Sequence, residues 1–129
     1  MSIPVSSLMS REVVTIGLED TIAEVEACFA EQQLGWAPVV DEHGTLIGVL
    51  STADLVRFRA GGRDLQAVPA WQLSTYGPIT VAPETPAREV ARRMVEAGIH
   101  HVVVTDEGRI MGVVSALDFV RAYADDREG

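Results

Sequence analysis

The feature that most constrains this chain is an internal repeat, in which a pattern of about 64 residues occurs twice. Its clearest part runs from Gly48 to Asp54 and returns from Gly112 to Asp118. Each copy has a glycine, two aliphatic residues, a serine, two further residues and an aspartate. This order predicts a buried strand that leads directly into a helix, with the serine at the N-cap and the aspartate at the third helical position. The fold must therefore accommodate the same strand-to-helix junction twice.

The two junctions have a ligand interpretation and a structural one. The start of a helix has unpaired N–H groups and suits an anion such as phosphate. A carboxylate, Asp54 or Asp118, could accept hydrogen bonds from both hydroxyls of a ribose, with Ser51 or Ser115 beside it. A glycine within a strand often marks close approach of a ligand or of another backbone. However, Ser-x-x-Asp is also an ordinary helix cap, and both interpretations stay open.

Each repeat predicts the order strand, helix, strand, strand, helix, which is an α+β fold. Half of the chain is too small to bury its sheet alone, so we expect the two repeats to pack sheet to sheet with pseudo-twofold symmetry. Short turns at 5–8 and 70–73 precede the repeats. The first repeat predicts strands 14–16, 36–40 and 45–50, with helices after Thr21 and at 52–60. The second predicts strands 79–81, 100–104 and 109–114, with helices after Thr85 and at 116–124.

The first helix of each repeat has its own start and end signals. Thr21 and Glu24 fit a capping box, and Thr85 is expected to cap a helix whose first residue is Pro86. Gly35 and Gly98 mark the ends. The predicted apolar faces are Ile22, Val25, Cys28 and Phe29 in the first helix, and Val90, Ala91, Met94 and Val95 in the second.

The repeat also divides the chain. We expect a first domain at 1–60, a linker at 61–69 that begins with two glycines, a second domain at 70–124 and a charged tail at 125–129.

Composition excludes several classes of function. The 129 residues carry a formal net charge of −9, which argues against nucleic acid or an anionic membrane as a partner. Apolar residues make up 47%, yet no stretch is long enough for a membrane span, and no signal peptide is recognisable. The single cysteine, Cys28, excludes an internal disulfide and a cysteine-cluster metal site. A cytoplasmic protein is the simplest interpretation.

The ordered set of motifs resembles a tandem pair of CBS (cystathionine-beta-synthase) domains, a Bateman module. Its signature is Pro38-Val39-Val40-Asp41 with Gly44 and Gly48, together with both Gly-x-x-Ser-x-x-Asp junctions. The resemblance runs from about Val5 to about Tyr123 and implies a stand-alone regulatory module without catalytic residues or a required cofactor. It also implies an adenosyl ligand (AMP, ADP, ATP or S-adenosylmethionine), a homodimer with helices at the contact, and an unidentified regulated partner.

The same resemblance implies two clefts between the repeats, and it supplies their residues. The aspartate of each junction would hold the ribose, and the adenine would pack between backbone segments of two strands. The implied ligand-binding residues are Thr15, Ala37, Pro38, Ser51 and Asp54 for one cleft, and Thr80, His101, Val102, Ser115 and Asp118 for the other. Arg57 and Arg121 are candidates for a phosphate contact. Arg59 and Arg63 cluster with Arg57 near the linker and could also reach a phosphate, and a solvated helix end is the alternative for this cluster.

The second repeat departs from the pattern. Aligned by the junctions, Val102 stands in the place of Pro38, and Thr105 in that of Asp41. His100 and His101 replace Trp36 and Ala37, so recognition of the base or the phosphate is expected to differ between the clefts.

Three alternatives remain. The adjacent pair His100–His101 points to opposite faces of a strand, which disfavours a shared metal ion. A ligand-free module for dimerisation or protein interaction would use the junctions only as helix caps. A small enzyme would need a nucleophile with a base or a phosphate loop, and the sequence displays neither motif.

Overall fold

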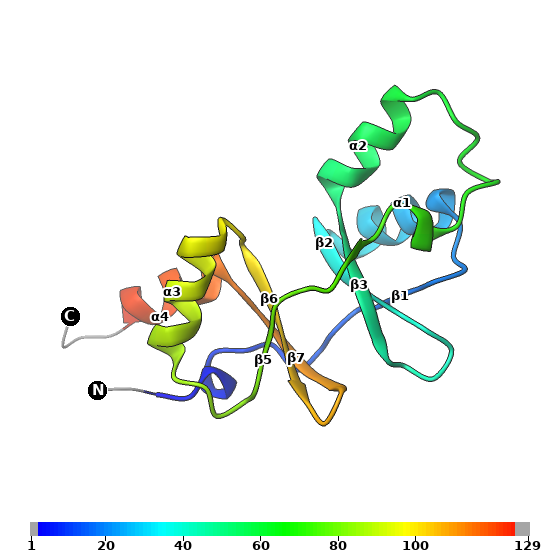
Figure 1. The fold of residues 1–129 in the computed structure, drawn as a ribbon. Coiled ribbons are helices and arrows are strands. Elements are labelled where there is room, and N and C mark those ends of the chain that lie inside the picture. Colours follow the sequence, from blue (N-terminus) through cyan, green and yellow to red (C-terminus); the bar gives the residue numbers. More distant parts are fainter. Residues whose placement is uncertain (1–2, 126–129) are drawn as a thin grey trace. The chain divides into compact units, whose positions relative to one another are not determined.

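In a computed structural model, residues 3–125 are described and divide into two compact units. Residues 14–78 form one of them, here called the central unit, and the terminal unit combines the residues before 14 with those after 78. Each unit contains one sheet and two α-helices (Figure 1). The predicted α+β class and the repeated order of elements are therefore confirmed.

The central unit has a sheet in the order β1-β2-β3-β4. Its strands are β1 (Ile16–Gly17), β2 (Trp36–Val40), β3 (Leu46–Ser51) and β4 (Thr75–Tyr76). Strands β1 and β2 are parallel because helix α1 (Ile22–Gln32) connects them, whereas the other pairs are antiparallel. Helix α2 (Thr52–Ala60) follows β3 without a loop, and the 3-10 helix η2 (Ala70–Gln72) precedes β4.

The terminal unit repeats this plan with the sheet order β5-β6-β7. Its elements are η1 (Val5–Ser7), β5 (Thr80–Val81), α3 (Ala87–Ala97), β6 (His101–Asp106), β7 (Arg109–Ser115) and α4 (Ala116–Asp125). Strands β5 and β6 are parallel, and β6 and β7 form an antiparallel hairpin. Of the predicted charged tail, Asp125 ends α4, and residues 126–129 lie outside the described part.

The segment that precedes each repeat packs on the other one. Val5 belongs to the buried cluster of the terminal unit, and Ser10 pairs with Val113 of β7. In the central unit, Ala70 belongs to the core and Thr75 pairs with Val49 of β3. The structural units are therefore offset from the sequence repeats by one such segment.

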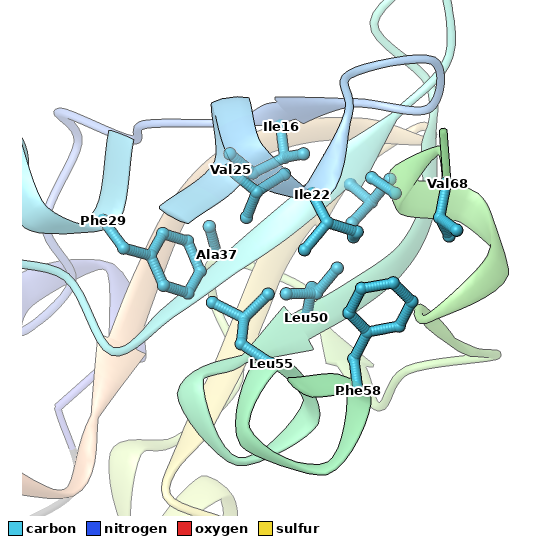
Figure 2. Close-up of a cluster of buried hydrophobic side chains, with 11 residues drawn as sticks. Ile16, Ile22, Val25, Phe29, Ala37, Leu50, Leu55, Phe58 and Val68 are labelled. Atoms are coloured by element: carbon cyan, nitrogen blue, oxygen red, sulfur yellow. The ribbon is translucent and has the colours of Figure 1, made fainter. Parts of the chain in front are cut away.

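The core of the central unit lies between one face of the sheet and the two helices. Figure 2 shows Ile22 and Phe29 of α1 and Phe58 of α2 pointing toward Leu50 of β3. Val68, from the predicted linker, closes the same cluster. With Val25 of α1 and Leu55 of α2, the helical side chains of this core recur three or four residues apart, which is the spacing that lines one face of a helix.

Four details differ from the expectations. Thr85 was predicted to cap α3, but this is wrong, because Pro86 itself takes the N-cap position with an extended backbone (ψ 132°). Helix α1 ends at Gln32, near Gly35, but Gln33 rather than the glycine takes the left-handed C-cap position. Val95 is 81% exposed and does not belong to the core. Strand β4 is an additional strand that no local pattern indicates, because it is only two residues long and pairs with a distant segment.

Candidate functional site: the two strand-to-helix junctions

The first junction is a complete capping box. The backbone N–H of Ser51 (2.8 Å) and its hydroxyl (2.9 Å) both donate to Oδ2 of Asp54. In return, the backbone N–H of Asp54 donates to Oγ of Ser51 at 3.4 Å. The structural interpretation of Ser-x-x-Asp is therefore confirmed, since these bonds satisfy N–H groups that the start of α2 would otherwise leave unpaired.

The second junction has the same geometry. The Ser115 backbone N–H and hydroxyl donate to Oδ2 of Asp118 at 2.7 and 3.1 Å, and the Asp118 N–H donates to Ser115 Oγ at 3.3 Å. Two junctions 64 positions apart thus orient their carboxylates in the same way. In both cases one carboxylate oxygen is used by the cap.

The other carboxylate oxygen is what distinguishes these junctions from a cap alone. Oδ1 of Asp54 forms an ion pair with Arg57, and Oδ1 of Asp118 lies 3.9 Å from a guanidinium nitrogen of Arg121. The two arginine side chains are about 70% exposed, so solvent competes for these pairs. Oδ1 can therefore accept hydrogen bonds from a ligand while Oδ2 keeps the helix capped.

The glycine in each junction lies close to the backbone of another segment of the chain. A Cβ on Gly48 would lie 2.6 Å from the carbonyl oxygen of Thr75, and one on Gly112 would lie 2.7 Å from that of Ser10. These contacts come from the segments that precede the opposite repeats. Of the two interpretations of a glycine within a strand, close approach of another backbone is confirmed at both positions.

The strand ladders bring the other predicted residues of the first site to one edge of the central sheet. Trp36, at the start of β2, lies opposite Ser51 at the end of β3. Ile16 of β1 pairs with Val39, which places Thr15 level with Pro38. Thr15 is exposed and Pro38 is buried. Ala37 points into the core, so any ligand contact of Ala37 has to use its backbone.

The second site is shifted by one residue from its predicted alignment. Across the β6–β7 hairpin, Ser115 lies opposite His101, which therefore matches Trp36. Val102 points into the core as Ala37 does, and Val103 matches Pro38. The assignment of Val102 to the place of Pro38 is wrong.

The cause of this shift is the length of the hairpin turns. Four residues, Asp41–Gly44, stand where the second repeat has three, Asp106–Gly108. The repeats therefore lie 65 residues apart before the turn and 64 after it. Asp106, and not Thr105, matches Asp41, so the second repeat keeps this aspartate. Counting the turn residues is the signal that would have aligned Trp36 with His101 and Pro38 with Val103.

His101 is the titratable residue that distinguishes the second site. Burial lowers the pKa of its imidazole, the neighbouring His100 lowers it further, and Asp118 acts in the opposite direction. His101 is half-buried and His100 is exposed. Within residues 3–125, no three His, Cys, Asp or Glu side chains group so that they could hold a metal ion.

A polar cavity adjoins the first junction. It has a volume of about 190 Å³ and extends from Asp54 along α2 to the end of η2. Its lining residues are Asp54, Arg57, Phe58, Arg63, Gln72 and Leu73. Arg63 belongs to the arginine cluster that the sequence offers as a phosphate contact, whereas Gln72 is a candidate that the sequence did not indicate, because it comes from a segment without a motif.

The terminal unit has an apolar cavity of about 290 Å³ between α3 and α4. Met94, Ile99 and Phe119 are among its lining residues. Large apolar side chains are also exposed on these helices, namely Val95, Leu117, Val120 and Tyr123. None of the described helices is both long enough and apolar enough to cross a membrane.

The sequence and the fold were compared with those of known proteins. The family model for the CBS domain matches residues 5–61 and 70–125. The protein MJ1225 of Methanocaldococcus jannaschii is 28% identical over 123 residues, which are 95% of this chain and 44% of that protein. The chain thus spans less than half the length of three curated relatives that it matches, the proteins MJ1225, MJ0188 and MJ1404.

Two solved structures have the same fold. The CBS domain pair of protein MJ0100, in complex with 5′-methylthioadenosine and S-adenosyl-L-methionine, is 25% identical. Its TM-score is 0.85, over 96% of this chain and 98% of that one. The structure of CBSX2 in complex with AMP has a TM-score of 0.85 at 22% identity, over 95% and 96% of the two chains. At 22% identity, the similarity to CBSX2 shows only that the two folds are alike.

Proposed function

Because the chain belongs to the CBS-domain family, we propose that it is a non-catalytic regulatory module that binds an adenosyl ligand at its two junctions. The ligand would be an adenine nucleotide or S-adenosylmethionine, and no cofactor would be required. Binding would change the activity of a partner protein by favouring one of two states of the module. The proposed location is the cytoplasm, where a free thiol such as Cys28 stays reduced.

The observation that carries this proposal is the acceptor capacity that the capping boxes leave unused on Asp54 and Asp118. In each, Oδ2 serves the cap and Oδ1 lies beside an exposed arginine. The two hydroxyls of a ribose can donate to one carboxylate. A helix cap uses only one carboxylate oxygen, so the second oxygen is available for a ligand. The complex of the MJ0100 domain pair with two adenosyl compounds supports the same ligand class.

The proposed contacts are those that the resemblance to the family implies, and the strand ladders support them. The residues of the first site are Thr15, Ala37, Pro38, Ser51 and Asp54, with Ala37 acting through its backbone. The residues of the second are Thr80, His101, Val102, Ser115 and Asp118, with Val102 acting through its backbone and Val103 added by the register. Arg57 and Arg121 are the proposed phosphate contacts.

The test is thermal unfolding with AMP, ADP, ATP and S-adenosylmethionine, each at millimolar concentration. A ligand at 100 times its Kd adds about 2.7 kcal/mol to the free energy of unfolding, which raises the Tm by several degrees. The double variant Asp54→Asn with Asp118→Asn should lose this rise, since an amide keeps one oxygen for the cap but offers the ribose no second acceptor.

The control is Asp106→Asn with Asp125→Asn, which changes the net charge equally at two exposed positions. The control should keep the full rise. A rise that persists in the Asp54 and Asp118 double variant, or no rise with any of the four ligands, would contradict the proposal.

We also propose a homodimer through α3 and α4, because a specific observation favours it. Helix α4 has no buried residue, and Leu117 and Val120 are more than half exposed. Together with the apolar cavity between α3 and α4, they form a patch that a partner surface would cover. A second copy of the chain offers a surface of the same apolar character.

A further inference from the structure

The polar cavity beside Asp54 has the lining of an anion site. Two arginines, Arg57 and Arg63, line it together with one carboxylate residue, Asp54, and the amide residue Gln72. Its volume of 190 Å³ equals the liquid volume of about six water molecules, which is enough for a phosphate group with part of its hydration.

The two arginines are held in different ways. The guanidinium of Arg63 stacks over the ring of Phe58, with 5.4 Å between its central carbon and the ring centroid. Phe58 is 5% exposed and belongs to the core, so this contact keeps Arg63 at the wall of the cavity. Stacking uses the face of the guanidinium and leaves its N–H groups available at the edge.

Arg57 is bound to the atom that a ribose would need. It pairs with Oδ1 of Asp54, the oxygen that the capping box leaves free, and its side chain is 72% exposed. A ribose bound to Oδ1 would displace this guanidinium. The displaced group has an anion partner only if the ligand itself brings one, because Asp54 is the carboxylate that lines this cavity.

We infer that this cavity is a phosphate subsite, and that the junction of the central unit therefore selects phosphorylated adenosyl ligands over uncharged ones. This inference rests on the proposed function. On binding, Arg57 exchanges Asp54 for the phosphate, and Arg63 completes the subsite from the wall formed by Phe58. A ligand such as adenosine displaces Arg57 without offering it a new partner, and so binds more weakly.

Calorimetric titration with AMP, adenosine and inorganic phosphate tests the inference, on a protein whose second junction carries Asp118→Asn. AMP should bind at least about tenfold more tightly than adenosine. Arg57→Gln and Arg63→Gln should each weaken AMP binding about tenfold, the loss of a charged hydrogen bond. Neither should weaken adenosine binding, since Asp54 stays intact. The matched control is Arg88→Gln, an exposed arginine of α3.

The outcomes separate this inference from the proposed function. Equal affinity for AMP and adenosine, unchanged in both arginine variants, would overturn the phosphate subsite while the ligand class stands. Inorganic phosphate that binds as tightly as AMP would also overturn it, because the cavity would then be a site for free phosphate. Failure of both AMP and adenosine to bind would overturn the proposed function itself, and the inference with it.

Discussion

His101 of β6 lies directly opposite Ser115 of β7, the residue whose hydroxyl caps α4. In the central unit the same place opposite the capping serine is held by Trp36. One junction thus has an imidazole beside its capping box and the other an indole. The pH dependence of stability should therefore differ between the two junctions.

Acidification should destabilise the protein through His101. Burial and the neighbouring His100 lower its pKa, with Asp118 opposing them, so the native state takes up this proton less readily than the unfolded chain. Below the unfolded pKa of about 6.5, the free energy of unfolding falls with pH until the folded pKa is reached. The slope should stay below about 1.4 kcal/mol per pH unit, because the ring is partly exposed.

Urea denaturation at pH 7.5 and 5.5 measures this effect. The variant His101→Gln should lose less stability over this interval than the original protein. His43→Gln, in an exposed turn, is the control and should behave like the original. If His101→Gln and the original protein lost the same stability between pH 7.5 and 5.5, the pH dependence would not come from His101.

Replacing either mid-strand glycine with alanine should destabilise the fold by about 1 to 3 kcal/mol. The added Cβ would lie 2.6 Å from the Thr75 carbonyl oxygen in Gly48→Ala, and 2.7 Å from the Ser10 carbonyl oxygen in Gly112→Ala. Backbone atoms cannot yield as the end of a flexible side chain can. Denaturant unfolding followed by circular dichroism gives the values.

The matched control for the glycine variants is Gly35→Ala. Its Cβ would lie 3.6 Å from Thr52 Oγ1, an ordinary contact, so its effect should stay within about 0.5 kcal/mol. Equal stability of the Gly48, Gly112 and Gly35 variants would contradict the close contacts of Gly48 with Thr75 and of Gly112 with Ser10.

Removing a capping hydroxyl should cost stability at each junction. Ser51→Ala and Ser115→Ala each remove an acceptor for the backbone N–H of the third helical residue, at a cost of about 1 kcal/mol. Ser7→Ala, at an exposed position of η1, serves as the control. If Ser51→Ala and Ser115→Ala left the free energy of unfolding in urea unchanged, the capping boxes would contribute nothing to stability.

A charge on the apolar face of α4 should prevent dimer formation. Val120 is 60% exposed, so Val120→Glu leaves the core of the subunit intact while it places a carboxylate in the proposed contact. Light scattering during gel filtration should show a dimer for the original protein and a monomer for the variant. Val56→Glu, on exposed α2, is the control. A monomeric original protein would exclude the dimer.

Much of this fold can be predicted from the sequence, because its signals are local. The Thr21–Glu24 capping box and the junctions at Ser51 and Ser115 depend on residues three positions apart. Strand β2 and helix α2 begin and end where the pattern places them. The cap predicted at Thr85 fails because Pro86 has an extended backbone and so stands outside the helix that it was expected to begin.

The rest depends on contacts between distant segments. Strand β4 exists because Thr75 and Tyr76 pair with β3, and a pattern of two residues is too short to predict this pairing. The register of the second site depends on one residue fewer in a hairpin turn, which moves His101 and Val103 by one place against the first site. The polar cavity needs Arg63 and Gln72, which only tertiary packing brings near Asp54.

The offset between units and repeats also sets an order of events during synthesis. The central unit is complete once the ribosome has added residue 78, so its eleven-residue core can assemble before the second repeat exists. Val5 and Ser10 are made before the central unit, yet their partners in the terminal unit, which include β7 and α3, are made after it. A segment that is made before the central unit thus reaches its native contacts only after that unit is complete.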